Sequence, residues 1–156
     1  MSESFDRDLL IILHDVARAM RTLFDQKARA SNAMTRAQWI ILSRLEKQPG
    51  MSQNELAAIC EVEPMTVARL VDRLEARGMV ERRSDPFDRR IRRLHLLPAA
   101  KPVLETITHT RETMSERIIA GLDDKTREEL IDALLVIKEN IANEALSDHA
   151  LVEAGE

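Results

Sequence analysis

Residues 63–96 have the sequence EPMTVARLVDRLEARGMVERRSDPFDRRIRRLHL, and the expected architecture of the chain follows from them. After Pro64, apolar residues recur every three or four positions, which predicts a helix with one buried stripe. Proline suits the first helical position because its missing N–H needs no partner there. Gly78 is expected to end this helix in the left-handed conformation. The turn residues of 84–88 then separate two strands, predicted over 79–83 and 89–96.

The predicted hairpin is strongly basic although the chain is acidic. Between Arg82 and Arg93 there are six arginines against two aspartates, a local charge of +4. The net charge of the 156-residue chain is −4, so the rest of it carries −8. A charge run is often only a solvated surface. Cations gathered at one turn would, however, confine contact with a phosphate backbone to one face. The pattern therefore favours a nucleic-acid-binding surface.

Two short helices are predicted upstream of this segment. Capping-box patterns at Thr35–Gln38 and Ser52–Glu55 predict helices over residues 36–47 and 53–60. The first has the apolar centre Trp39–Leu42 and is expected to be buried on both sides. Together with the downstream helix and hairpin, these helices make a winged helix-turn-helix.

Longer helices are expected on both sides of this unit. Residues 2–30 carry an apolar stripe at helical spacing, with Ser2 or Ser4 as the cap. After the hairpin, we expect one helix over 98–120 and a last helix that Asp123 or Asp124 begins. Apolar residues of the last helix step by four, three and four, a seam that pairs with another helix.

The predicted fold class is mainly α, an α+β winged helix-turn-helix with about six helices and a two-stranded β wing. Dimerisation is expected through the N- and C-terminal helices. We assign residues 1–34 and 98–147 to the helical dimerisation region, 35–97 to the DNA-binding winged helix-turn-helix and 148–156 to a flexible tail.

Composition and motifs argue against several other classes. The longest apolar run, Leu9–Leu13, is too short to span a bilayer, we find no secretion signal, and one cysteine suits a reducing cytoplasm. The four scattered glycines form no phosphate-binding loop, no local Ser, His and acid set suggests catalysis, and the histidines lack metal-ligand spacing. We expect a cytoplasmic protein that is not an enzyme, is not in a membrane and needs neither metal nor cofactor.

Several motifs together resemble the MarR family of transcriptional regulators. They are Leu56-Ala57, Thr66-Val67-x-Arg69, Asp72-x-Leu74-Glu75-x-x-Gly78-Met79-Val80-x-Arg82 and Asp85-Pro86-x-Asp88-Arg89-Arg90. Trp39 and the run from Pro98 to Leu104 are similar to the SlyA-like branch. Two positions depart from the family pattern. The second strand ends in Leu97-Pro98-Ala99-Ala100 where the family usually has Leu-Thr and then a glycine, and Glu61 stands at a turn that often holds glycine, where it would carry some strain.

The resemblance implies an obligate homodimer, most simply a repressor, that binds double-stranded DNA at a near-palindromic operator. Its two recognition helices would lie about 34 Å apart, one turn of the duplex. The expected DNA-binding residues are Ser52, Gln53, Pro64, Thr66, Arg69, Arg73, Asp88, Arg89 and Arg90.

These residues have different expected roles. Thr66 and Arg69 would contact base edges or phosphates from the major groove, since arginine commonly reads guanine, and Arg73 would bind phosphate. By the family pattern, Arg89 would insert into a narrow A·T-rich minor groove. Asp88 would orient an arginine rather than meet DNA. Ser52 and Gln53, at a helix start, would add backbone N–H contacts.

The family commonly binds small phenolic or aromatic carboxylate effectors between the dimer base and the DNA-reading unit. By this resemblance, Trp39 with Arg18 or Arg21 would form an apolar slot with a cationic end. The alternative is that Trp39 belongs to the core and the arginines form surface ion pairs.

Two other functions stay open at this point. A winged-helix module that binds protein without specific DNA binding would keep the helices but would need no arginines at the wing tip. A redox-sensing regulator would use Cys60. This cysteine ends a short helix where an apolar residue would pack, and no cation lies near it in sequence, so we expect a buried, inert thiol.

Overall fold

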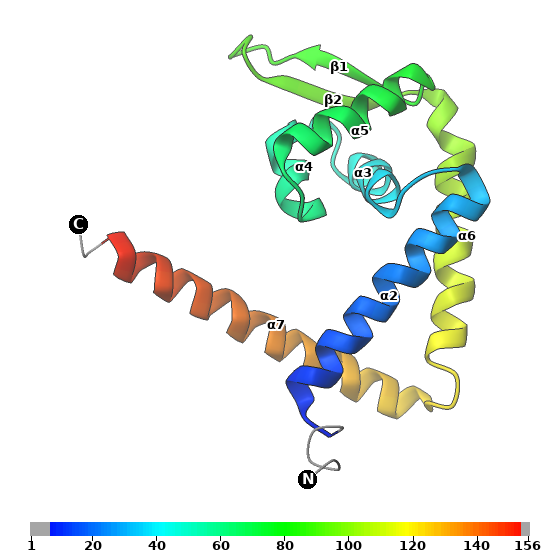
Figure 1. Ribbon diagram of the computed structural model, residues 1–156, viewed down its shortest axis with the longest axis vertical. Coiled ribbons are helices and arrows are strands. Elements are labelled where there is room, and N and C mark those ends of the chain that lie inside the picture. Colours follow the sequence, from blue (N-terminus) through cyan, green and yellow to red (C-terminus); the bar gives the residue numbers. More distant parts are fainter. Residues whose placement is uncertain (1–6, 154–156) are drawn as a thin grey trace. The chain divides into compact units, whose positions relative to one another are not determined.

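The computed structural model describes residues 7–153, a mainly helical chain with one two-stranded antiparallel sheet (Figure 1). The elements are α2 (Leu9–Asn32), α3 (Arg36–Lys47), α4 (Gln53–Cys60), α5 (Pro64–Ala76), β1 (Val80–Ser84), β2 (Arg92–Leu96), the 3-10 turn η1 (Pro98–Ala100), α6 (Lys101–Ile118) and α7 (Asp124–Glu153). Two compact units divide after Glu112, within α6. Within the described range, no helix has the length and apolar character needed to cross a bilayer. The predicted winged-helix fold class is confirmed.

Both predicted capping boxes are present. Gln38 N donates to Thr35 Oγ1 at 3.3 Å while Thr35 N donates to Gln38 Oε1 at 3.0 Å. Glu55 N likewise donates to Ser52 Oγ at 3.3 Å, and Ser52 N donates to Glu55 Oε2 at 2.6 Å. Each box satisfies two N–H groups that would otherwise lack partners at a helix start. Helices α3 and α4 therefore begin and end where the sequence predicted.

The first described helix begins later than predicted. Asp8 caps α2, because its Oδ1 accepts from two first-turn N–H groups at 3.0 and 3.1 Å. The predicted caps, Ser2 and Ser4, lie outside the described residues. At the other end, Ala33 closes α2 in the left-handed region with φ of 52°, and its N–H donates to a carbonyl of the last turn.

The chain after the hairpin also differs in detail. The helix predicted over 98–120 is divided into η1 and α6, and Gly121 then turns the chain with φ of +92°. Asp123 caps α7 by accepting from a first-turn N–H at 2.8 Å, as expected. Helix α7 continues to Glu153 although we expected a flexible tail from residue 148; residues 154–156 lie outside the described range.

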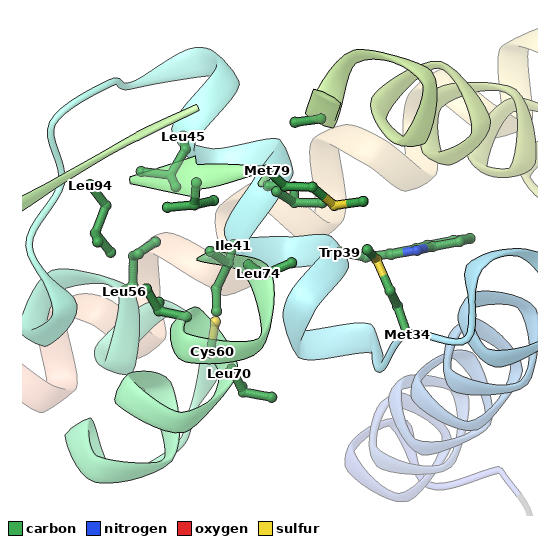
Figure 2. Packing of buried hydrophobic residues seen from close by; sticks show 14 of the residues in the cluster. Met34, Trp39, Ile41, Leu45, Leu56, Cys60, Leu70, Leu74, Met79 and Leu94 are labelled. Atoms are coloured by element: carbon green, nitrogen blue, oxygen red, sulfur yellow. The ribbon is translucent and has the colours of Figure 1, made fainter. Parts of the chain in front are cut away.

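The core of the first unit is built from α3, α4, α5 and the hairpin (Figure 2). Ile41 of α3, Leu56 of α4, Leu74 of α5 and Leu94 of β2 are all fully buried. Trp39 is also buried, and its ring extends from α3 away from this group. Burial of α3 on more than one side is thus confirmed. The apolar stripe of α5 belongs to the same core.

The hairpin projects from the first unit with its turn at the free end (Figure 1). The strands pair in the register Val80↔Leu96 to Ser84↔Arg92. The prediction that β2 begins at Arg89 is wrong. Residues 85–91 form a loop instead, in which Asp85 Oδ1 accepts from two N–H groups of the turn and Ile91 N donates to Asp88 O.

Candidate DNA interface

Helix α5 presents a polar face to solvent. Its stripe of Val67, Val71 and Leu74 is fully buried. The helical period then places Thr66, Arg69 and Arg73 on the exposed side, together with Pro64 at the first position. Neither Arg69 nor Arg73 forms a hydrogen bond or ion pair within the described part of the chain. Their charges are available to a ligand.

Arg82, counted above with the basic cluster, points inward and joins three elements. Its Nε donates to Gln53 Oε1 at 2.9 Å, and its Nη2 donates to Asp72 Oδ1 at 2.8 Å and to Ala68 O at 3.2 Å. Its Nη1 pairs with Glu75, which also accepts from Arg82 N at 3.0 Å. The side chain is only 21% exposed. Arg82 therefore ties β1 to α4 and α5, and the Gln53 amide oxygen is already engaged.

Arg93 makes a second tie, between the hairpin and the start of α4. Its Nε donates to Asp85 Oδ2 at 2.8 Å, and its Nη1 donates to Gly50 O and Glu55 Oε2, both at 3.3 Å. The pKa of Glu55 is lowered, chiefly by the N–H and hydroxyl of Ser52 and further by Arg93. Neither tie was predicted from the sequence, because a count of charges does not separate arginines that face inward from those that face outward.

Asp85 organises the wing tip. The residue is only 8% exposed, and its Oδ1 accepts from Phe87 N at 2.8 Å and Asp88 N at 2.9 Å. The Arg93 guanidinium and then these N–H donors lower the pKa of Asp85 to about 2. A charge-assisted network therefore fixes the loop that carries Arg89.

We expect the Asp85 carboxyl to titrate near pH 2 in the folded protein, against about 3.9 in an unfolded chain. Because the folded-state pKa is the lower one, its contribution to stability is complete above about pH 4 and is lost as the pH falls towards 2. Carbon-detected NMR titration, with Asp85→Asn to assign the signal, measures the midpoint. A midpoint near 4 would contradict the Asp85–Arg93 pairing.

The remaining wing-tip charges behave differently from one another. Arg90 Nη2 donates to Asp88 Oδ2 at 2.9 Å and Arg90 Nε to Asp88 Oδ1 at 3.1 Å, so Asp88 does orient an arginine. This pairing lowers the pKa of Asp88. Arg89 is exposed and has no hydrogen bond or ion pair to any other described residue. Arg89 is therefore free to enter a groove.

The start of α4 lies beside the hairpin. Ser52 forms an isolated β-bridge with Arg93, and the Ser52 N–H and hydroxyl are both used in the capping box. Gln53 and Asn54, in the first turn of α4, keep the N–H groups that a helix start leaves unpaired. A cavity of about 310 Å³ is lined by residues 52–55 and 90–93.

A larger cavity of about 510 Å³ is lined by α2, α3, the end of α4 and α6. Trp39 and Arg21 line it, as predicted, whereas Arg18 does not and instead pairs with Asp15 on the surface at 3.3 Å. Trp39 is only 3% exposed, and its buried Nε1 has no hydrogen-bond partner in the described structure. The wall is rich in cationic side chains: Arg21, Arg36, Arg44, Lys47 and Arg111, with Glu61 opposing them.

Of these cations, only Arg21 was predicted from the sequence to line the cavity. Arg36, Arg44 and Lys47 recur at i, i+8 and i+11 on α3, so they share one side of that helix. The spacing of this polar stripe is present in the sequence, but the apolar centre of the helix led us to expect burial on both sides. Arg111 had no local signal, because only tertiary folding brings α6 to the cavity.

The sulfur of Cys60 is buried, as predicted. Burial raises the pKa of its thiol, and the charges of Arg36 and Arg44 oppose that shift only in part. The thiolate that oxidation requires is therefore disfavoured. In the described part of the chain, no group of three or more His, Cys, Asp or Glu side chains is placed to hold a metal ion.

The geometry agrees with the comparisons to known proteins. The MarR family model matches residues 34–91, from the start of α3 to the wing loop. The chain is 26% identical to the transcriptional regulator SlyA, with a TM-score of 0.75, covering 88% of this chain and 96% of that one. It is also 26% identical to MarR, with a TM-score of 0.75 and coverage of 88% and 93%. A MarR family regulator from Listeria monocytogenes, solved with 26mer DNA, has the same fold (24% identity, TM-score 0.74, coverage 88% and 91%). Residues 34–91 therefore match the MarR family, and the chain as a whole has the fold of the SlyA and MarR transcriptional regulators.

Proposed function

We propose that this chain is a sequence-specific DNA-binding repressor of the SlyA-like type that acts as a homodimer in the cytoplasm. The observation that carries the proposal is the set of unpaired cations on the exposed face of α5 and at the tip of the wing. Among the described residues, Arg69 and Arg73 on α5 and Arg89 on the wing have no partner, whereas Arg82 and Arg93 are held by acidic side chains. The acidic side chains neutralise Arg82 and Arg93, and the charges of Arg69, Arg73 and Arg89 are therefore available to DNA.

In this proposal α5 enters the major groove and the wing tip enters the adjacent minor groove. Thr66 and Arg69 contact base edges near the helix start, beside Pro64, and Arg73 contacts phosphate one turn later. Arg89 enters a narrow A·T-rich minor groove, where the negative potential is deepest. Asp88 holds Arg90 at the groove edge, where the arginine meets phosphate.

Phosphate contacts at the start of α4 follow from its unpaired donors. The N–H groups of Gln53 and Asn54 point out of the first turn, and the helix dipole favours an anion there. Ser52 contributes by fixing this turn through its capping box with Glu55.

Exposed apolar side chains support the dimer. On α2 they are Leu9, Leu10, Ile12, Val16 and Met20, and on α7 they are Leu130, Ile131, Leu134, Leu135, Val136 and Ile141. A contiguous apolar helix face normally marks an association surface. We propose that residues 1–34 and 98–147 of a second copy cover these faces, and that the two-fold axis pairs the DNA-reading units.

Selection of genomic fragments by the purified protein, followed by footprinting, tests the DNA-binding proposal. We expect two related half-sites about 10 base pairs apart, bound by a dimer. Affinity for a random duplex should fall steeply between 50 and 200 mM salt, since several phosphates are neutralised. A weak, flat salt response would favour the protein-binding alternative. Deletion of the gene should raise transcription from the selected site if the chain is a repressor.

The cavity beside Trp39 supports an effector site for a small phenolic or aromatic carboxylate. Its apolar wall suits an aromatic ring and its cationic residues suit a carboxylate. The buried Trp39 Nε1 is a donor without a partner, and a ligand oxygen that reached it would satisfy it. Ligand bound here would contact α3 and Glu61, which precedes α5, and would thereby alter how α5 is presented.

Trp39→Phe is expected to weaken binding of 2-hydroxybenzoate about tenfold, because the variant keeps the ring but loses a donor worth roughly 1.5 kcal/mol to a charged acceptor. Loss of ring volume at this buried position should lower the melting temperature, so affinities are compared at a temperature where both proteins are folded. Calorimetric titration measures the affinity. Arg18→Ala, which changes a residue outside the cavity, is the matched control and should bind like the parent. Equal affinities of Trp39→Phe and the parent would contradict the site.

A further inference from the structure

Phe87 at the wing tip has an unusual position for an aromatic residue. It is 97% exposed, more than any other large apolar side chain whose burial is described, the next being Leu10 at 73%. Leu10 lies on a helix face that a second copy would cover, whereas Phe87 lies on a loop at the end of a projecting hairpin. Isolated exposed apolar residues are common, so exposure alone does not identify a function.

The backbone around Phe87 is held, and this sets the residue apart. Phe87 N and Asp88 N both donate to Asp85 Oδ1, at 2.8 and 2.9 Å. Arg93 Nε in turn holds the other oxygen of Asp85 at 2.8 Å. Asp85 N donates to Ile91 O at 3.0 Å, and Ile91 N donates to Asp88 O at 2.9 Å. These hydrogen bonds fix the backbone of the loop, and the loop presents the Phe87 ring to solvent.

The surroundings indicate what covers the ring. The unpaired Arg89 lies two residues away, and the exposed Arg90 and Arg92 follow it. A purely apolar protein surface would have to bury the uncompensated charge of Arg89. The ring of Phe87 needs an apolar surface, and Arg89 needs a negative one. The minor groove of DNA offers both, because its floor is strongly negative and its walls are formed by the apolar faces of deoxyribose.

We propose that Phe87 is a DNA-contacting residue whose ring packs against the deoxyribose wall of the minor groove that Arg89 enters. The inference rests on the DNA-binding function proposed above and adds an apolar contact to the charged ones. Such a contact releases no counterion, so it adds affinity that is independent of salt. It also reads groove width rather than base identity, and thereby sharpens selection of narrow, A·T-rich flanks.

The test compares the parent with Phe87→Ala, Phe87→Leu and Arg89→Ala, all as full chains, on the duplex recovered by fragment selection. Dissociation constants are measured between 50 and 300 mM salt. We expect Phe87→Ala to bind about three- to tenfold more weakly at every salt concentration, as loss of a partly buried aromatic contact predicts. Its slope of log affinity against log salt should equal that of the parent. Phe87→Leu should restore most of the loss, whereas Arg89→Ala should have a shallower slope.

Hydroxyl-radical footprinting supplies a direct readout, because these radicals attack deoxyribose from the minor groove. The parent should protect the minor-groove sugars that the wing contacts, and Phe87→Ala should protect them less at a concentration that saturates the duplex. Phe87→Ala that binds and protects like the parent would overturn the inference and leave the proposed function standing. A parent that shows no salt-dependent binding to any duplex would overturn the proposed function itself.

Discussion

Arg89→Ala is expected to weaken operator binding by roughly 10- to 100-fold, the loss that follows when a groove-reading arginine contact of about 1–3 kcal/mol is removed. The dimer and the melting temperature should stay unchanged. Arg89 is exposed and makes no hydrogen bond or ion pair with other described residues, so its removal breaks nothing in the folded protein. Fluorescence anisotropy with a labelled operator measures the affinity, and sedimentation confirms the assembly.

A matched control separates the effect of the position of Arg89 from the effect of losing one positive charge. Arg18→Ala removes the same charge from a surface site on α2, where the arginine pairs with Asp15. This variant should bind the operator within about twofold of the parent, because a distant exposed charge is screened by salt. If Arg89→Ala and Arg18→Ala bound equally well, the assignment of the wing tip to the minor groove would be wrong.

Arg82→Met is expected to lower the free energy of unfolding by about 2–3 kcal/mol, because it removes a guanidinium that is bonded to several charged and polar groups. Methionine keeps much of the stem volume, so the change reports the lost bonds rather than a cavity. Glu75, which is 32% exposed, would lose its cation, and Gln53 and Ala68 O would lose their donor. Urea unfolding followed by circular dichroism measures the difference.

The same variant should also bind the operator roughly tenfold more weakly at temperatures where it is fully folded, since Arg82 holds β1 against α4 and α5. The neighbouring Arg83 provides the matched control. It lies in the same strand, but its pair with Glu81 is exposed, and exposed pairs contribute little. Arg83→Met should change stability by no more than about 0.5 kcal/mol. Comparable losses in the two variants would show that Arg82 has no special positioning role.

The boundaries of the central helices were predictable because their signals are local. A capping box needs only residues three positions apart, as at Thr35 and Ser52, and both boxes formed as expected. The left-handed φ at Gly78 and Glu61 likewise follows from the need to turn the chain between adjacent elements. The start of α2 was predicted wrongly, because several polar residues near the beginning of the chain could serve as caps and the helix uses Asp8.

Arginine roles were less predictable. Of the basic residues in the hairpin, Arg82 and Arg93 are held by acids that lie many positions away in sequence, and Arg90 is held by Asp88. A charge count treats all of them alike. Most of the cations that line the Trp39 cavity were not predicted, for a similar reason. Arg111 of α6 and Arg21 of α2 line the same cavity only in the folded chain.

By itself, the sequence determined the helix caps, the buried stripe of α5, the hairpin and the concentration of cations at its tip, because each depends on residues within one or two turns of one another. Only the tertiary structure decided which arginines are structural and which are free, where β2 begins and which residues surround Trp39. Those outcomes depend on the burial and neutralisation of each charge, and these are set by partners that packing brings from distant parts of the chain.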